Sequence, residues 1–398
     1  MNSEVGDRST PAANVGRSRA TRKSGVTVAI TGAAGVLGHM LIDYLVDRPE
    51  TTDPSASVTV VAPDAPPSQA TSVQVSKIIG IDVRRGDSDR ITWRIGDVRD
   101  PALAKRLGGV DVVIHLAVDW SLDTPAAERT ALNVRGTQTV VTAAAAAGVD
   151  RVVLVTSCSV YGALADNPIP LPEDAPLMAS PEGLQADLLE MERIAVQARR
   201  VHPGLDVVVV RPAALVGPDV DSVVTRHFAA PLLLAIRDTS PTWQFCHVHD
   251  LCSALEYAAL GRVSGSVTCG SDGFLTQQRV EELTGLKRVE LPESVAMATA
   301  QRLHRLGLTP APASELTYVM HPLVVSSSQL RSAGWRPMFD NETNVRALVE
   351  DVRSARVLAG RRLGGRDAAV AGASAAGATV AVLGAAAFVR AARKARGR

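Results

Sequence analysis

Apolar positions in the N-terminal half of the chain alternate between short compact runs and helically spaced sets. Val26–Thr31 is a run typical of a buried strand, and the apolar residues between Leu37 and Leu45 that follow keep helical spacing. Further strand-like runs and helical patterns alternate along the chain; the strands are expected at 77–81, 91–95, 110–116, 151–156 and 206–210, and the helices at 126–147 and 183–201. This alternation predicts an α/β fold, a doubly wound parallel sheet covered by helices on both faces.

The pattern becomes less regular after Pro212. Helices are expected near 222–236, 251–260 and 294–306. We therefore expect a sheet domain over 25–211 and a smaller C-terminal substrate lobe over 212–352. Residues 49–75 are rich in Thr, Ser, Ala and Pro and are interpreted as an insertion, within which 57–62 is a candidate extra strand.

Both ends of the chain differ from its body. Residues 1–24 are polar and basic and are expected to form a disordered tail, while 353–398 form a linker and an Ala-rich C-terminal helix. Within the latter, 368–389 are 22 residues without a charge, long enough at about 1.5 Å per residue to cross a hydrocarbon core of about 30 Å. Eleven of them are Ala, and basic residues flank both sides, which disfavours crossing. Membrane contact and an exposed helix or disordered tail both stay open.

Charge and cysteine content narrow the class of protein. The 398 residues carry a net charge of +1, but the bases are concentrated in the two tails, so the body is acidic and a nucleic-acid-binding groove is disfavoured. The four cysteines have no framework spacing and the N-terminus has no apolar signal run. We expect a cytoplasmic protein, attached to the cytoplasmic membrane only if the C-terminal segment binds there.

Three glycines at a spacing of three lie between the first expected strand and the first expected helix. Gly32 suits the tight turn, Gly35 lets the backbone approach a diphosphate, and Gly38 lets the helix pack on the strand. The helix start offers unpaired amides to the anion. The turn therefore predicts a dinucleotide-binding site.

An acidic residue at the end of the second strand would accept hydrogen bonds from the adenosine ribose. Asp64 and Asp82 compete for this role, and we favour Asp82 because KIIGID leads directly to the next strand, which requires the insertion to be looped out. An acid at this point favours NAD over NADP, whereas Arg84 and Arg85 nearby keep NADP open.

Several further motifs occur in one order along the chain. They are TGAAGVLG at 31–38, GDV at 96–98, HLA at 115–117, NVRGT at 133–137, TSCSVYG at 156–162, RP at 211–212 and QFCHVHDL at 244–251. Through these motifs, residues from about 25 to 352 resemble the extended short-chain dehydrogenases of the NAD-dependent epimerase/dehydratase family, which have a Rossmann fold. The resemblance implies NAD as cofactor, held by Gly32, Gly35, Val36, Leu37, Gly38, Asp82, Asp97, Val98, Leu116, Ala117, Asn133 and Pro212.

The catalytic pattern of the resembled family is incomplete. Ser157 matches its active-site serine, but the positions of its proton-transferring tyrosine and lysine carry Leu184 and Leu188. Neither leucine can transfer a proton, which should cost about 10²- to 10⁴-fold in rate. Tyr161 and Asp187 are weighed as substitutes, although each has an ordinary structural alternative.

Two functional hypotheses follow. The first is an atypical NAD-dependent oxidoreductase or epimerase that acts on a sugar nucleotide or a similar polar carbonyl compound. The alternative is a non-catalytic NAD(P)-binding protein, a sensor or scaffold that has lost the Tyr-x-x-x-Lys pair. The resemblance also implies a homodimer packed through two long helices. We expect no metal, because the spacing of Cys246, His247, His249 and Cys252 suits no tetrahedral site.

Overall fold

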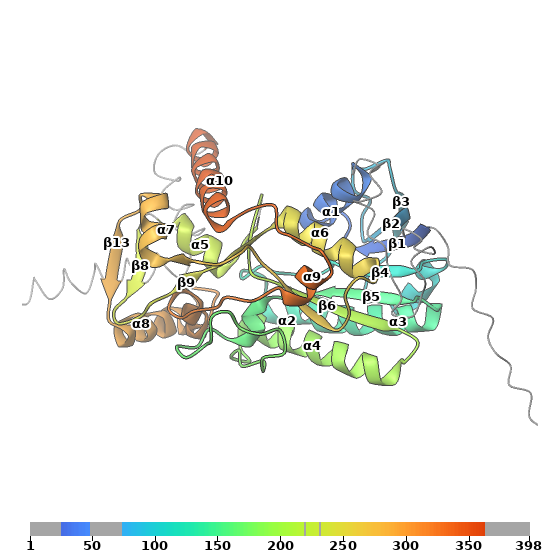
Figure 1. Ribbon diagram of the computed structural model, residues 1–398, viewed down its shortest axis with the longest axis horizontal. Coiled ribbons are helices and arrows are strands. Elements are labelled where there is room, and N and C mark those ends of the chain that lie inside the picture. Colours follow the sequence, from blue (N-terminus) through green and yellow to red (C-terminus); the bar gives the residue numbers. More distant parts are fainter. Residues whose placement is uncertain (1–24, 48–73, 219, 231, 363–398) are drawn as a thin grey trace, which may run out of the picture.

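The computed structural model describes residues 25–47, 74–218, 220–230 and 232–362. A seven-stranded sheet with the order β11-β6-β5-β4-β1-β2-β3 forms its centre, and every pairing in it is parallel (Figure 1). Its strands are β1 (Gly25–Thr31), β2 (Gln74–Asp82), β3 (Thr92–Ile95), β4 (Val112–His115), β5 (Arg151–Val155), β6 (Asp206–Pro212) and β11 (Ser266–Cys269). The strand order reverses between β1 and β4, and this point leaves a crevice at the carboxyl ends of the strands.

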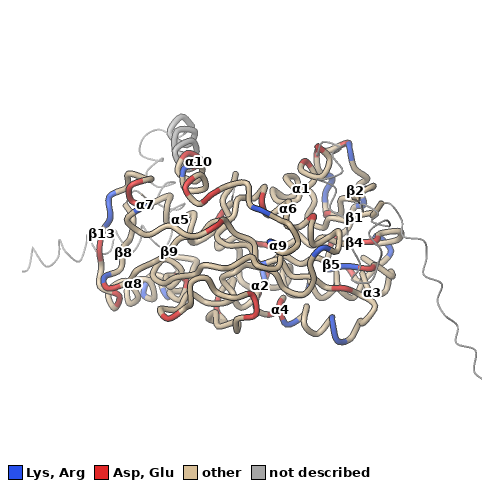
Figure 2. The backbone as a smooth tube through the Cα atoms, in the orientation of Figure 1, with Lys and Arg blue, Asp and Glu red and all other residues tan. Residues whose placement is uncertain are grey.

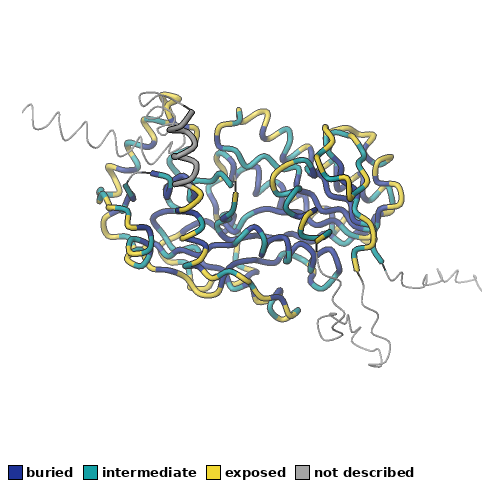
Figure 3. Tube along the Cα trace, turned by 90° about the horizontal axis from the view of Figure 1, so that it is seen from above, coloured by how far each residue is buried: buried dark blue, intermediate teal, exposed yellow. Residues whose placement is uncertain are grey.

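Helices cover both faces of the sheet, as the predicted α/β fold requires. Alternate residues of β1 face opposite layers: Val28 and Ile30 pack with α1 and α6, whereas Ala29 packs with α3 and α4. In Figure 3 the buried residues lie mainly in the interior of the molecule, and the exposed residues lie mainly toward its periphery. The covering helices are α1 (Val36–Val46) and α6 (Val248–Ala259) on one face, and η2 (Pro101–Leu107), α2 (Ala126–Thr130), η3 (Ala131–Gly136), α3 (Thr137–Ala147) and α4 (Gly183–Val201) on the other.

A smaller lobe follows at the carboxyl end of the sheet. Phe228, Trp243 and Phe245 are buried in its core, where the Phe228 ring contacts each of the other two edge-on. The lobe consists of β7 (Ala214–Val216), α5 (Val223–Ala229), β8 (Leu233–Ile236), β9 (Thr242–Trp243), β10 (Phe245–His247), β12 (Leu275–Thr276), α7 (Gln277–Thr284), β13 (Arg288–Leu291), α8 (Glu293–Arg305), η5 (Ala313–Val319) and α10 (Asn341–Arg362). The chain does not divide once at residue 212, because α6, β11 and α9 (Ser328–Ser332) return to pack on the sheet.

Two expected helices differ from the observed elements. The helix expected over 222–236 is wrong beyond Ala229: residues 233–236 form β8, which pairs in parallel with β13. The sequence has a proline at 231, which disfavours a continuing helix, and the short apolar run after it fits either period. The helix expected over 126–147 is interrupted by η3, a π-helical turn.

Some sequence predictions fall outside the described residues. These are the tail 1–24, nearly all of the insertion 49–75 with Asp64, and the Ala-rich segment 368–389. Among the helices that the structure describes, none combines the length and the apolar character needed to cross a membrane.

Candidate functional site

The glycine turn joins the end of β1 to the start of α1. Two of its glycines are required by the packing of the protein itself. Gly32 has a φ of +70°, and a Cβ there would lie 2.6 Å from the amide nitrogen of Ala117. A Cβ on Gly38 would lie 2.3 Å from the carbonyl oxygen of Gly32. Both distances are far below van der Waals contact, so these positions exclude any side chain.

Gly35 differs from Gly32 and Gly38. It has an ordinary φ of −84°, and the nearest atom to a Cβ built there is the Gly32 oxygen at 3.2 Å. The protein's own packing therefore explains little of the missing side chain. The space beside Gly35 faces the start of α1, whose first amides have no acceptor within the helix. This arrangement fits the diphosphate of a dinucleotide, which would need close backbone approach at this point.

A cavity of about 330 Å³ begins at this turn and passes the carboxyl ends of β4, β5 and β6 to reach the lobe. Many of the predicted site residues line it: Gly32, Gly35, Val36, Leu37, Gly38, Leu116, Ser157, Leu184, Leu188 and Pro212. Asp82, Asp97, Val98, Ala117 and Asn133 are not among its lining residues. The cavity thus connects the glycine turn with the positions where the family's catalytic residues are expected.

Asp82 ends β2 and lies against the glycine turn. Its carboxylate accepts a hydrogen bond from the Ala34 amide at 3.0 Å, and the Arg84 guanidinium donates to the Ala34 carbonyl at 3.3 Å. Two of the three side chains that bear on the choice between NAD and NADP, Asp82 and Arg84, therefore meet at the turn, whereas Arg85 pairs with Asp89. Asp97 lies after β3, where its ion pair with Arg99, at 2.7 Å, lowers the pKa of the carboxyl.

Asn133 is buried in η3 and holds the chain that follows β4. Its side-chain oxygen accepts from the Asp119 amide at 2.7 Å, and its side-chain nitrogen donates to the Asp119 carbonyl at 3.0 Å. Val98 is also buried, against Gly136. The sequence predicts cofactor contacts for both residues. In the structure neither lines the cavity, and both pack behind the segments that do.

His115 ends β4 beneath this loop and is fully buried. Its Nδ1 lies 2.7 Å from the Thr31 hydroxyl and its Nε2 lies 3.2 Å from the Thr137 hydroxyl. Burial lowers the pKa of His115 to about 4, so the ring is neutral at physiological pH. Thr137 donates its proton to the Asn133 carbonyl, so its oxygen accepts from Nε2–H, and the neutral ring links β1, β4 and α3.

Ser157 follows β5 and lines the cavity beside two leucines. Its Oγ accepts from the Ser159 amide at 3.1 Å. Leu184 and Leu188 come from the first two turns of α4, and both line the same cavity, with Leu188 fully buried. The two leucines that the sequence predicts at the family's tyrosine and lysine positions thus face the cavity, and they present hydrocarbon to it.

Tyr161 lies outside the cavity lining in a buried polar network. Its hydroxyl donates to the Glu173 carbonyl at 2.8 Å and accepts from Arg211 at 2.7 Å. Arg211 also forms a two-point ion pair with Glu192, with both contacts at 2.8 Å. Burial raises the pKa of Tyr161 to about 12. The Tyr161 hydroxyl thus uses its proton and one lone pair to join β6 to the segment after η4 (Cys158–Tyr161).

Asp187 faces away from the cavity toward α2 and η3. Its carboxylate is 3% exposed, pairs with Arg129 at 2.8 Å and accepts from the Thr130 hydroxyl at 2.6 Å. The Asn133 amide lies 3.5 Å from it. These contacts anchor α4 to the neighbouring helices and leave the carboxylate fully partnered.

Two polar residues of η5 line the cavity and were not anticipated from the sequence. Glu315 is 5% exposed, and its carboxylate accepts a long hydrogen bond of 3.4 Å from Gln185. Burial raises the pKa of Glu315 to about 7, against the opposing effects of Gln185 and Arg129. Tyr318 donates to the Ser159 carbonyl at 2.9 Å. The segment around 313–319 has neither a motif nor a regular pattern, so no sequence signal marks these residues.

No cluster of three or more His, Cys, Asp or Glu side chains that could hold a metal occurs in the described ranges. Cys246 instead lies 3.4 Å from Cys269, sulfur to sulfur, and His247 caps the N-terminus of α6 through the His249 amide.

Comparison with known proteins agrees with this geometry. A family model described as the NAD dependent epimerase/dehydratase family matches residues 28–267. An uncharacterised protein of Mycobacterium tuberculosis is 27% identical over 312 residues, which cover 73% of this chain and 83% of that protein. The 4-hydroxy-2-methyl-3-oxo-4-farnesyl-3,4-dihydroquinoline-1-oxide ketoreductase of Stigmatella aurantiaca is 29% identical over 262 residues, 63% of this chain and 69% of the relative.

Among solved structures, the dTDP-glucose 4,6-dehydratase DesIV of Streptomyces venezuelae, solved with NAD bound, superposes with a TM-score of 0.59. It is 22% identical and covers 83% of this chain and 98% of that chain, so it supports the fold. A parallel sheet with a glycine turn at its strand-order reversal defines a nucleotide-binding α/β protein. The chain belongs to the NAD-dependent epimerase/dehydratase family, and the resemblance inferred from its motifs is confirmed.

Proposed function

We propose that this chain binds NAD at the glycine turn and acts as an atypical oxidoreductase or epimerase on a carbonyl or hydroxyl compound held in the adjoining cavity. The observation that carries the proposal is Gly35. Its missing side chain leaves open the space in front of the first amides of α1, although the protein alone would accommodate a Cβ there with a small shift. A bound diphosphate gives that open space a purpose.

Several residues would hold the cofactor. The α1 amides would bind the diphosphate and Asp82 the adenosine ribose, with Asp97 and Val98 toward the adenine and Leu116, Ala117, Asn133 and Pro212 toward the nicotinamide end. When bound, NAD supplies hydride acceptance and donation. The family's dependence on NAD and the acid at the end of β2 both support NAD over NADP.

The proton chemistry is the atypical part. Ser157 would hydrogen-bond a substrate oxygen, while Leu184 and Leu188 would exclude water from the position where a proton acceptor would act, which is supported by the presence of all three in the cavity lining. We assign no proton transfer to Tyr161 or Asp187, because their polar atoms are occupied outside the cavity lining. A redox reaction is therefore expected to be slower by about 10²- to 10⁴-fold than with an intact acid-base pair.

The two leucines also favour a second candidate function. A non-catalytic NAD(P)-binding protein, acting as a sensor or scaffold, would keep the cofactor turn and could lose the proton-transferring pair. The names of relatives support a sugar nucleotide as the ligand, such as dTDP-glucose, whereas the composition of the cavity favours a less charged one. A homodimer packed through α3 and α4 remains our expectation for the assembly.

The test combines cofactor binding with turnover. Calorimetry should show NAD binding to the wild-type chain and a loss of about 100-fold or more in Gly35→Val, because the added side chain fills the diphosphate space. Gly204→Val is the matched control, since a Cβ at Gly204 meets nothing within 4 Å. Unchanged NAD affinity in Gly35→Val would overturn the cofactor assignment.

Turnover separates the two candidate functions. For the wild-type chain and for the Leu184→Tyr, Leu188→Lys double variant, net alcohol oxidation would be followed as NADH formation with neutral alcohols. Conversion of sugar nucleotides would be followed by product analysis, because an epimerase returns the hydride to its substrate and accumulates no NADH. Slow turnover that increases in the double variant supports the oxidoreductase. Tight NAD binding without turnover in either protein supports the non-catalytic alternative.

A further inference from the structure

The part of the cavity that faces the lobe is lined mainly by hydrocarbon. Leucine, valine and tryptophan side chains from both halves of the molecule contribute to it, among them Trp120, Leu184, Leu188, Leu215, Val224 and Trp243. Burying an apolar ligand surface against such a lining is favourable by about 25 cal/mol per Å². The lining therefore suits a ligand with large apolar parts.

Cations are absent from this lining. Lys and Arg occur on many elements of the described chain, interleaved with Asp and Glu (Figure 2), but none of the described residues that line the cavity is Lys, Arg or His. Asp221 and Glu315 are its carboxyl-bearing residues. A second diphosphate bound here would be desolvated without an opposite charge, and such burial is strongly unfavourable.

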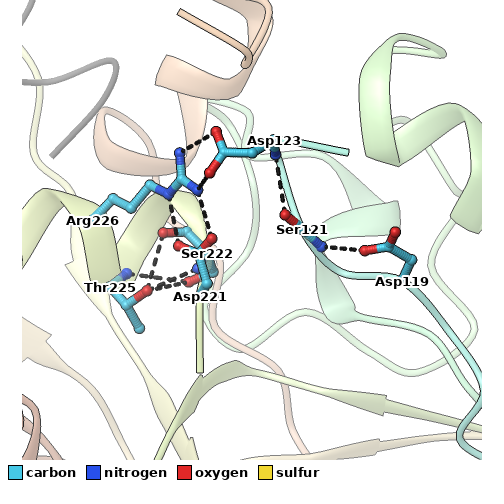
Figure 4. Close-up of polar contacts among 7 residues, drawn as sticks. All are labelled: Asp119, Ser121, Asp123, Asp221, Ser222, Thr225 and Arg226. Carbon is cyan, nitrogen blue, oxygen red and sulfur yellow. Dashed lines mark hydrogen bonds and ion pairs between the residues drawn. The ribbon is translucent and has the colours of Figure 1, made fainter. Parts of the chain in front are cut away.

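Arg226 of α5 is close to the cavity but is already neutralised. Its guanidinium contacts the carboxylates of Asp123 and Asp221, with the shortest distance to each at 2.6 Å (Figure 4). Its side chain is only 9% exposed. Releasing Arg226 toward a ligand phosphate would break both ion pairs, so this residue does not replace the missing cation.

Glu315 is one of the hydrogen-bonding groups in this otherwise mainly apolar lining. Apart from the 3.4 Å contact with Gln185, no described residue hydrogen-bonds to its carboxyl group. Gln185 in turn accepts from the Ser159 hydroxyl at 2.9 Å, and Tyr318 donates to the Ser159 carbonyl. The other charged groups nearby are Arg129 and Asp187, which pair with each other. One carboxyl oxygen of Glu315 is thus left for a ligand.

We propose that this half of the cavity binds an uncharged, mainly apolar compound with one carbonyl or hydroxyl oxygen, which hydrogen-bonds to Glu315, in place of a nucleotide diphosphate. The proposal rests on the proposed function in that NAD fills the other half. Burial raises the pKa of Glu315 to about 7, so at neutral pH and below a large share of the carboxyl groups are protonated and donate to a ligand carbonyl.

The probe for this site is prodan, an uncharged naphthyl ketone whose emission moves to the blue in apolar surroundings. With saturating NAD present, we expect prodan to bind the full chain with blue-shifted emission, and UDP-glucose and dTDP-glucose not to displace it. Displacement of prodan by either sugar nucleotide, or loss of prodan binding when NAD is added to the NAD-free chain, would overturn the proposal. NAD binding is measured separately by calorimetry, so a failure of the cofactor assignment is recognised independently.

The pH dependence of prodan binding tests whether Glu315 is the group that binds the ligand. Prodan affinity should fall as the pH rises above about 7, by up to about tenfold per pH unit, because the ionised carboxylate cannot donate to a ketone. In Glu315→Gln the amide still donates and does not ionise, so binding should persist and become independent of pH. Glu293→Gln, on the exposed start of α8, should keep the wild-type profile. An unchanged pH profile in Glu315→Gln would contradict the role of Glu315.

Discussion

Glu315 is a carboxyl group that the fold buries without an ion pair to any described residue. Its weak contact with Gln185 and the more distant charge of Arg129 do not balance the loss of water around it. The folded chain therefore favours the protonated form of this side chain. That preference has a consequence for stability which does not depend on any ligand.

We expect the chain to lose stability as the pH rises from about 4.5 to about 7. The pKa of Glu315 is raised from 4.5 to about 7 on folding, so its stabilising contribution is complete below the lower value and is lost as the pH passes the higher one. A shift of this size corresponds to about 3 kcal/mol in the free energy of unfolding. Urea unfolding at a series of pH values measures the effect.

Glu315→Gln separates this group from all other titrating residues. The difference in unfolding free energy between the wild-type chain and this variant should change over the stated pH interval and be constant above it. Glu293→Gln, which alters an exposed carboxyl of the same lobe, is the matched control for this substitution. Parallel curves for the wild-type chain and Glu315→Gln would show that Glu315 ionises normally.

At the scale of elements, prediction succeeded where one pattern dominated. α4 was predicted from its periodicity with the bounds that are observed, 183–201, because its buried face and its exposed face are clearly separated. Strand β2 was likewise identified from KIIGID, which places Asp82 at its end. The segment 233–236 was misassigned because a short apolar run fits both a helix and a strand.

The candidate site was likewise predictable only where its residues belong to a motif. The glycine turn and the leucines of α4 follow from motifs with a known order, and the structure brings them to one cavity. Glu315 and Tyr318 reach the cavity from η5, more than 120 residues further along the chain than Leu184 and Leu188. Such a meeting depends on how the lobe packs, which no local pattern encodes.

The π-helical turn η3 is an element whose irregularity has a role. It places Asn133 so that one side chain satisfies both the amide and the carbonyl of Asp119, in the loop that carries the cavity residues Val118 and Trp120. We expect Asn133→Leu to cost about 2 kcal/mol in unfolding free energy, because two partly buried polar groups of Asp119 lose their partner. Hydrogen exchange of 117–121 should accelerate and NAD affinity should fall.

Gln138→Leu is the control for this prediction. Gln138 lies at the exposed surface of α3, where its side-chain amide donates to the Thr142 hydroxyl at 3.4 Å. Replacing this exposed amide side chain by leucine should therefore leave exchange in 117–121 as in the wild-type chain. Equal exchange in the two variants would mean that Asn133 does not hold the loop.

At the scale of the whole molecule, one line of hydrogen bonds joins the sheet domain to the lobe. Asp119, held by Asn133, accepts from the Ser121 amide, and Ser121 accepts from the Asp123 amide. Asp123 then pairs with Arg226 of the lobe (Figure 4). The loop between β4 and α2 is thus fixed at both ends, and it forms one wall of the cavity.

Removing either end of the final ion pair should affect the molecule differently. In Asp123→Asn, Arg226 keeps its pair with Asp221, and because Asp123 is 64% exposed, we expect a loss of about 1 kcal/mol or less, diminished further by salt. In Arg226→Gln the carboxylates of Asp123 and Asp221 face each other without a cation, so the loss should be larger and the loop 118–125 should exchange faster. Thermal unfolding and hydrogen exchange measure both variants at low and high salt. A smaller loss of stability in Arg226→Gln than in Asp123→Asn would contradict this expectation. It would mean that the repulsion between Asp123 and Asp221 is negligible, and that the ion pair of Arg226 with Asp123 does not hold the lobe against the sheet domain.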